Sequence, residues 1–275
     1  MTRWTLTQRH STTNGVVVWD RLGSGPPVIL LHGTPFSSYV WRDVAAALAR
    51  THSVFVWDML GYGNSEKRPD QDVSLATQAA VFADLLRVWE LECPAVVAHD
   101  FGGAVALRAL LLHDSVYDRL ALVDAVAHSP WGTGLFQLVR EHPDVLGRLP
   151  SALHEALVRA YIGGASHRGL PESTLAAYVS PWLGAEGQAA LYRQMAQGEE
   201  RFTDEMADRY ADIDIPVMVC WGTEDTWLLP SKGEQLAAAI PAAELRWLHG
   251  AGHLVQEDTP AQLTAALVDF LRDAR

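Results

Sequence analysis

The sequence predicts an α/β protein: a mostly parallel central sheet, helices on both faces and a helical insertion. Three observations lead to this expectation. Short apolar runs that suit strands alternate with longer segments of helical composition. The strand-like runs are continuously apolar, which is typical of strands buried on both faces of a parallel sheet. The alternation is interrupted once, between residues 129 and 208.

The first thirty residues predict a β-hairpin ahead of the parallel strands. Polar and apolar residues alternate there around the turn signal Asn14-Gly15, and a second turn follows at Gly23-Ser-Gly-Pro-Pro27. The run Pro27-Val-Ile-Leu-Leu31 then predicts the first buried strand. The elements predicted after it are helices over 39–50, 74–90, 103–112, 231–239 and 261–275 and strands over 53–57, 95–98, 119–123, 217–221 and 244–248.

The interrupting stretch, residues 129–208, predicts a helical cap domain on a core domain of residues 1–128 and 209–275. It contains Gly and Pro breaks and helix-length segments such as 151–161, without a clear buried strand. Its many aromatic side chains suggest an apolar substrate, although aromatic residues also pack helical lids without touching a ligand. The candidates for substrate contact are Trp131, Tyr161, Tyr178, Trp182, Tyr192 and Tyr210.

Composition and charge narrow the class of protein. The formal net charge of −12 argues against a nucleic-acid partner, because binding to phosphates needs clustered Lys and Arg. The first ten residues have no apolar signal-peptide core, and no run approaches the roughly 20 apolar residues of a membrane span, so we expect a cytoplasmic protein. Cys93 and Cys220 adjoin apolar runs and are expected to be small core residues rather than a disulfide. The oligomeric state is left open.

The string Ala95-Val-Val-Ala-His-Asp-Phe-Gly-Gly103 carries the main chemical signal. An apolar strand meets a helix through a tight turn, which places the middle side chain at the carboxyl edge of the sheet and at a helix N-terminus. The usual nucleophile turn reads Gly-x-Ser-x-Gly, and Asp100 occupies the position of its serine. The alternative interpretation is that Asp100 is an ordinary N-cap.

A second turn could supply hydrogen bonds to a developing oxyanion. The string Leu30-Leu-His-Gly-Thr-Pro35 ends an earlier strand with a Gly-containing turn. Backbone N–H groups of such a turn and of the residue after the nucleophile can stabilise an oxyanion. The predicted donors are therefore the N–H groups of Thr34 and Phe101.

Two further polar residues follow strands later in the chain. Asp225 comes shortly after the strand over 217–221, and His253 lies in a glycine-rich loop after the next strand. The order Asp100, Asp225, His253 is the nucleophile–acid–histidine order of the nucleophile-elbow enzymes. His253 would be the base and Asp225 would orient its ring. Asp124, which follows the strand over 119–123, is the other candidate for the acid.

Three motifs together resemble the haloalkane dehalogenase and epoxide hydrolase branch of the α/β-hydrolase superfamily, over residues from about 14 to the end. These motifs are His32-Gly-Thr-Pro-Phe-Ser-Ser-Tyr-Val-Trp-Arg42, Trp57-Asp-Met-Leu-Gly-Tyr-Gly-Asn-Ser65 and His99-Asp-Phe-Gly-Gly103. The resemblance implies an α/β-hydrolase fold, an aspartate nucleophile and a cap over the site.

The chain departs from the relatives at two positions. Haloalkane dehalogenases usually have Trp after the nucleophile to hold the halide and often Asn after His-Gly, whereas this chain has Phe101 and Thr34. Fluoroacetate dehalogenases are similar in the His-Asp pair and in an acid at the position of Asp124, but they have Arg where Phe101 stands. Epoxide hydrolases need a cap tyrosine as proton donor, and Tyr161, Tyr178, Tyr192 and Tyr210 are available.

A carboxylate nucleophile changes the expected reaction. It can displace a leaving group at an sp³ carbon, and His253 would then activate water to hydrolyse the resulting ester. The predicted function is hydrolysis of an epoxide or a carbon–halogen bond in a small apolar substrate, with water as co-substrate. The alternative is a fold member that has lost hydrolysis and binds small molecules or catalyses another reaction. No cofactor is expected. His249 and His253 have the i, i+4 spacing of a metal-binding pair on a helix, but the glycines between them disfavour a helix, so no metal is expected.

Overall fold

A computed structural model describes residues 4–241 and 243–272 of the chain. An eight-stranded sheet in the order β1-β2-β4-β3-β5-β6-β7-β8 forms its centre. The strands are β1 (Gln8–Thr12), β2 (Gly15–Leu22), β3 (Pro27–Leu31), β4 (Ser53–Asp58), β5 (Ala95–His99), β6 (Arg119–Val123), β7 (Val217–Gly222) and β8 (Glu244–Leu248).

The strand directions confirm the predicted mostly parallel sheet. β1 pairs antiparallel with β2, whose other edge pairs antiparallel with β4. The pairs β3–β4, β3–β5, β5–β6, β6–β7 and β7–β8 are all parallel. The predicted hairpin turns at Asn14-Gly15, where Thr12 lies opposite Gly15. Because the strands from β3 to β7 run parallel, their carboxyl ends meet at one edge of the sheet.

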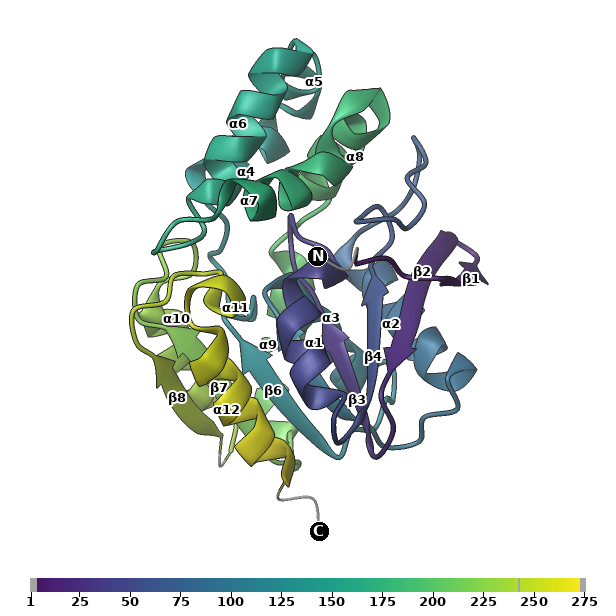
Figure 1. Cartoon of the computed structure of the whole chain (residues 1–275), viewed down its shortest axis with the longest axis vertical. Helices are drawn as coiled ribbons and strands as arrows, with labels where there is room; N and C mark the ends of the chain where they lie inside the picture. The colour runs from purple at the N-terminus through teal and green to yellow at the C-terminus, as the bar shows by residue number, and fades with distance from the viewer. Residues whose placement is uncertain (1–3, 242, 273–275) are drawn as a thin grey trace.

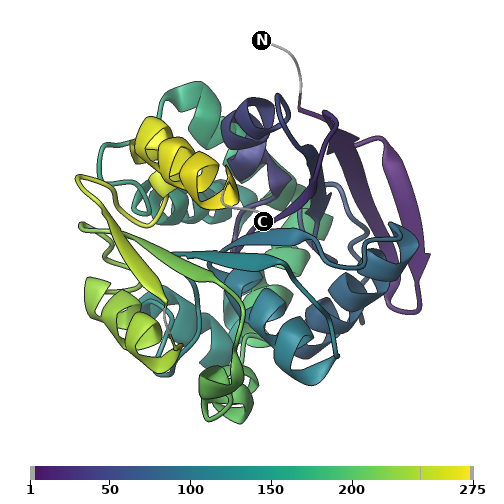
Figure 2. The same cartoon turned by 90° about the horizontal axis from the view of Figure 1, so that it is seen from below.

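Helices cover both faces of the sheet (Figure 2). One face carries α1 (Arg42–Leu48) and α12 (Pro260–Arg272), and the other carries α2 (Leu75–Val88), α3 (Phe101–Leu112) and α10 (Pro230–Ala239). In α2 the buried residues Leu75, Ala79, Phe82 and Leu86 recur every three or four positions, as expected of a helix with one apolar face.

The interrupting stretch is helical, as predicted, and most of it lies over one end of the sheet (Figure 1). This part contains α4 (Gly134–Glu141), α5 (Pro143–Leu146), α6 (Ser151–Gly163), α7 (Glu172–Val179), η2 (Ser180–Trp182) and α8 (Gly184–Ala196). The next helix, α9 (Arg201–Ala207), lies against core helix α3, where Arg108 Nη1 donates to the Phe202 carbonyl at 2.7 Å. The boundary at residue 208 stays a prediction.

Several local expectations need correction. The predicted helix over 39–50 begins as the 3₁₀ helix η1 (Ser38–Trp41), because Asp58 Oδ1 accepts the Ser38 N–H at 2.8 Å and holds the chain in a tighter turn. Cys93 is exposed rather than part of the core, because it lies in the turn before β5 begins. Cys220 is buried in β7, and both thiols are free.

At the C-terminus, helix α12 confirms the predicted element as far as Arg272, and residues 273–275 lie outside the described part. The chain also forms η3 (Tyr210–Asp212) before β7 and the short helix α11 (Val255–Asp258) between β8 and α12. Within residues 4–241 and 243–272, no helix has the length and hydrophobicity needed to cross a membrane.

Candidate active site

Asp100 lies at the sharp turn between β5 and α3. Its backbone has φ 53° and ψ −121°, a conformation that side-chain-bearing residues rarely adopt. Strain of this kind is concentrated at functional sites, where the surrounding structure holds it in place. The Asp100 side chain makes no capping hydrogen bond to α3, so the geometry does not support the alternative of an ordinary N-cap.

Two glycines allow neighbouring segments to approach this turn. A Cβ on Gly33 would lie 2.2 Å from Asp100 Oδ1. A Cβ on Gly102 would lie 2.6 Å from the His32 carbonyl oxygen. Any side chain at either position would therefore push apart the turn after β3 and the turn after β5.

The turn after β3 directs a backbone donor at the Asp100 carboxylate. The Thr34 N–H donates to Asp100 Oδ1 at 2.6 Å. His32 fixes this turn, because its Nδ1–H donates to the Gly33 carbonyl and its Nε2 accepts the Met59 N–H, both at 2.9 Å. One oxygen of Asp100 is thus already seated where an oxyanion would form, beside the Thr34 donor predicted from the sequence.

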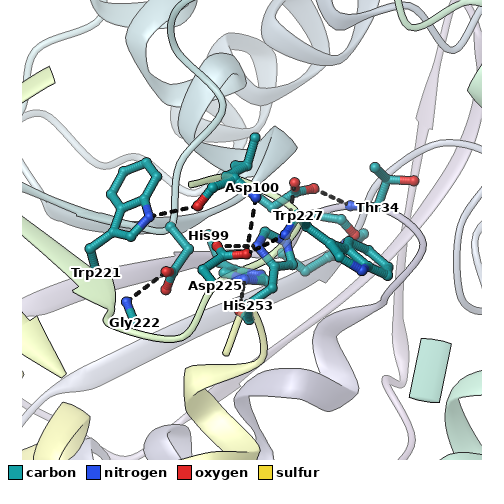
Figure 3. A network of polar contacts seen from close by, with 12 residues as sticks. Thr34, His99, Asp100, Trp221, Gly222, Asp225, Trp227 and His253 are labelled. Atoms are coloured by element: carbon teal, nitrogen blue, oxygen red, sulfur yellow. Dashed lines mark hydrogen bonds and ion pairs between the residues drawn. The ribbon is translucent and has the colours of Figure 1, made fainter. Parts of the chain in front are cut away.

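His253 lies between two carboxylates, as Figure 3 shows. Its Nδ1–H donates to Asp225 Oδ2 at 2.9 Å, and its Nε2 is 3.4 Å from Asp100 Oδ2. The other Asp225 oxygen, Oδ1, accepts the N–H groups of Trp227 at 2.7 Å and Leu228 at 3.0 Å. These bonds hold the Asp225 carboxylate, which in turn fixes the orientation of the imidazole ring.

Asp124 is fully buried but does not hold the histidine. Its Oδ1 accepts the Gly222 N–H at 2.8 Å. Burial and the nearby charge of Asp225 raise the pKa of Asp124 well above its ordinary value. Of the two candidates for the acid, only Asp225 hydrogen-bonds to His253 Nδ1.

The charges of Asp100 and His253 stabilise each other. Burial favours a neutral Asp100, but the hydrogen bond and charge of His253, with a smaller contribution from the Phe101 N–H, lower the pKa of Asp100. Burial also disfavours a charged His253, yet the carboxylates of Asp225 and Asp100 outweigh it and raise the pKa of His253 well above its ordinary value. Asp100 is consequently an ionised carboxylate, the form that can act as a nucleophile.

A small cavity of about 20 Å³ lies beside Asp100. Thr34, Asp100 and Phe101 contribute its core side. The remaining lining residues are Val126, Trp131, Gly132, Thr133, Phe136, Tyr161, Trp227 and Leu228. This volume is enough for one water molecule. Binding of any larger molecule therefore requires displacement of the aromatic side chains or of the helices above them.

The family model for the alpha/beta hydrolase fold matches residues 26–260. The chain belongs to this family. A solved alpha/beta hydrolase fold protein from Burkholderia ambifaria is 44% identical with a TM-score of 0.94, covering 97% of this chain and 98% of the other. The family places this protein among hydrolases, and its fold is that of the alpha/beta hydrolases.

Curated relatives of this α/β-hydrolase include proteins named for several reactions. An uncharacterised Mycobacterium tuberculosis protein is 32% identical, over 90% of this chain and 76% of its own. A fluoroacetate dehalogenase of Burkholderia sp is 29% identical, over 92% and 89%. Epoxide hydrolase 2 of Caenorhabditis elegans is 26% identical, over 90% and 74%.

Two of the six predicted substrate-contact residues, Trp131 and Tyr161, line the small cavity beside Asp100. The other four do not line it. The Tyr178 hydroxyl donates to Glu257, and the Trp182 indole N–H donates to the Pro35 carbonyl at 2.7 Å. Tyr192 and Tyr210 are also engaged elsewhere, with the Tyr192 hydroxyl bound to His154 Nδ1 at 2.9 Å and the Tyr210 hydroxyl to the Ala127 carbonyl at 2.6 Å.

Sequence reasoning missed two residues of this hydrolase site. Trp227 stacks on His253 with ring centroids 5.1 Å apart and on Tyr161 at 4.4 Å. An aromatic residue two positions after the candidate acid was the available signal. His99 donates its Nε2–H to the His253 carbonyl at 3.0 Å, and burial lowers the pKa of His99 to about 3, so the ring is neutral. Its place beside Asp100 in the His-Asp pair was the signal for this second residue.

Proposed function

We propose that this α/β-hydrolase is an epoxide hydrolase that acts through an ester between Asp100 and its substrate. The observation that supports this function is the position of Tyr161, which lines the same cavity as Asp100. Burial and the charge of Asp100 raise the pKa of Tyr161, so its hydroxyl is protonated at neutral pH. A nucleophile and a proton donor on one cavity are the two groups that epoxide opening requires.

In the first step, Asp100 Oδ2 attacks one carbon of the epoxide. A carbon–oxygen ester bond forms, the carbon–oxygen bond of the ring breaks, and Tyr161 protonates the oxygen that leaves. Meanwhile Oδ1 stays hydrogen-bonded to the Thr34 N–H, so the carboxylate is held in one orientation for attack.

In the second step, water attacks Cγ of Asp100 while His253 takes its proton. The tetrahedral oxyanion develops on Oδ1, where the Thr34 and Phe101 N–H groups stabilise it. Collapse breaks the bond between Cγ and the alkylated oxygen, and the second proton of the attacking water moves to that oxygen, so a diol leaves and Asp100 is again a carboxylate. Esterification removes one of the two negative charges that raise the pKa of His253, so before the water attacks, the ring returns a proton to the Tyr161 phenolate and becomes the neutral base that this step needs.

Carbon–halogen cleavage is the second candidate, because a fluoroacetate dehalogenase is among the relatives. A departing halide needs N–H or O–H donors that point into the cavity. Phe101 supplies no side-chain donor, and the Trp131 indole N–H is already given to Thr203 Oγ1 at 3.0 Å. Neither Phe101 nor Trp131 therefore offers a free side-chain N–H to a halide, which favours epoxide opening.

The Tyr161→Phe variant tests this choice. We expect wild type to convert epoxides to diols, and Tyr161→Phe to do so roughly 10²-fold more slowly because the proton donor is lost. Turnover should be followed on epoxides, haloalkanes and haloacetates. Tyr192→Phe is the matched control, since its hydroxyl binds His154 inside the cap. Halide release by wild type that is unaffected in Tyr161→Phe, without diol formation, would instead identify a dehalogenase. If no member of the panel reacts, a binding or non-hydrolytic role gains support.

Asp225→Asn and Asp124→Asn form a second, paired test. Asp225→Asn removes the charge that orients and stabilises the His253 imidazolium, and we expect turnover to fall by about 10³-fold or more. Asp124→Asn keeps an acceptor for the Gly222 N–H and removes no hydrogen bond to His253, so turnover should change by less than about threefold. Steady-state rates on the same epoxide give both values. The reverse ranking would assign the role of acid to Asp124.

A further inference from the structure

Gln194 links the cap helix α8 to two segments of the core. Its side chain is 1% exposed. Oε1 accepts the Thr34 hydroxyl at 2.8 Å and the Tyr62 hydroxyl at 2.7 Å. Thr34 follows β3 and Tyr62 follows β4, so a single cap side chain is bound to two loops at the carboxyl edge of the sheet.

Thr34 connects this contact to the nucleophile. Its backbone N–H donates to Asp100 Oδ1, while its hydroxyl donates to Gln194. The position of that N–H therefore depends on how the Thr34 side chain is held. On the core side His32 secures the preceding carbonyl of Gly33, and on the cap side the hydrogen bond to Gln194 secures Thr34 itself.

We propose that Gln194 is a positioning residue that keeps the Thr34 N–H aligned with the oxyanion, so that ester hydrolysis is efficient only when the cap is seated. This inference rests on the proposed function. The alignment matters most in the second step, where full negative charge develops on Oδ1. In the first step the charge on the Asp100 carboxylate declines, so a displaced Thr34 donor costs less there.

The energetics of the contact also favour a role beyond packing. Gln194 Nε2 is buried without a hydrogen-bond partner among the described residues. An unpaired buried amide is costly, and a leucine or methionine would fill a helix position without that cost. The two hydrogen bonds that Oε1 accepts, from the hydroxyls of Thr34 and Tyr62, explain why an amide occupies this position.

The Gln194→Met variant tests the proposal, with Gln188→Met as its control. Methionine approximates the size of glutamine but lacks a strong acceptor. Gln188 lies in the same helix, and its Nε2 donates to the carbonyls of Gly147 and Leu149, both in the inserted helical segment. The control therefore loses two part-buried glutamine hydrogen bonds in the same helix without touching Thr34.

Two measurements are needed. Hydrogen exchange of the peptide containing Thr34 in ligand-free protein should be faster in Gln194→Met than in wild type or Gln188→Met. Single-turnover kinetics with an epoxide should show ester hydrolysis slowed roughly tenfold, less than the 10²–10³ expected for complete loss of an oxyanion donor. Ester formation should change by less than about threefold, so the ester accumulates on Asp100.

Thr34→Val removes the donor of the same hydrogen bond and remains informative should Gln194→Met fold poorly. The double variant should be no slower in hydrolysis than the worse single variant, because both remove one interaction. Equal slowing of ester formation and hydrolysis, or unchanged exchange at Thr34, would overturn the proposal. If wild type forms no ester with any epoxide, the proposed function fails instead, and the exchange measurement still decides whether Gln194 holds Thr34.

Discussion

The His253→Phe variant is expected to react with an epoxide once and then stop, with the substrate attached to Asp100. Ester formation needs only the ionised carboxylate and the proton donor, whereas hydrolysis needs a base within reach of the attacking water. His253 Nε2, 3.4 Å from Asp100 Oδ2, is in position to be that base. Multiple turnover should fall by on the order of 10³-fold or more.

A measurement of the intact protein mass detects the trapped ester and, from the size of the added mass, also identifies the substrate class. An epoxide adds its whole mass, while a halogenated substrate adds its mass less that of the hydrogen halide. Peptide mapping should place the addition on Asp100. His113→Phe, an exposed position outside the cavity, is the control and should turn over normally. Full multiple turnover by His253→Phe would show that hydrolysis does not depend on His253.

Asp100→Asn is expected to lose both steps. The amide keeps the size of the side chain and an oxygen for the Thr34 N–H, but it is a poor nucleophile, so turnover should fall by on the order of 10³-fold or more. No covalent addition should appear in the Asp100→Asn/His253→Phe double variant. If the adduct still formed in the double variant, the nucleophile would be a residue other than Asp100.

Isotope labelling of the wild-type enzyme tests, without any mutation, whether water attacks Asp100 or the epoxide. With enzyme in excess over epoxide in ¹⁸O-water, the first turnover should place ¹⁸O in the Asp100 carboxylate, because water attacks Cγ and the original aspartate oxygen leaves with the diol. Label in the diol after a single turnover would indicate direct attack of water on the epoxide, with Asp100 acting as a base.

Much of the fold could be predicted because its signals are local in the sequence. The apolar run that becomes β5 and the small residues after it specify a strand, a tight turn and a helix within a few positions. The parallel strands then follow from this alternation, since parallel strands need crossover connections. Cys93 shows the limit of such reasoning, because an apolar neighbourhood in sequence did not place it inside the core.

The candidate site was predictable to the extent that it lies at strand ends. Asp100, Asp225 and His253 follow strands whose carboxyl ends meet at one edge, and the structure brings these three together. The sequence favoured Asp225 but left Asp124 open, because both residues follow neighbouring buried strands. The choice depends on loop geometry, which carries Asp225 to His253 and leaves Asp124 bonded to Gly222.

The sequence by itself determined the fold class, the position of the candidate nucleophile and the order of the candidate catalytic residues. Only the tertiary structure decided which of the candidate tyrosines lines the cavity beside Asp100 and that Gln194 binds Thr34. Strands, turns and helices are encoded by neighbouring residues, whereas the last two features depend on how the cap helices pack. Thr34 and Gln194 are 160 positions apart, and a polar residue inside a helix has no motif that reveals its partner.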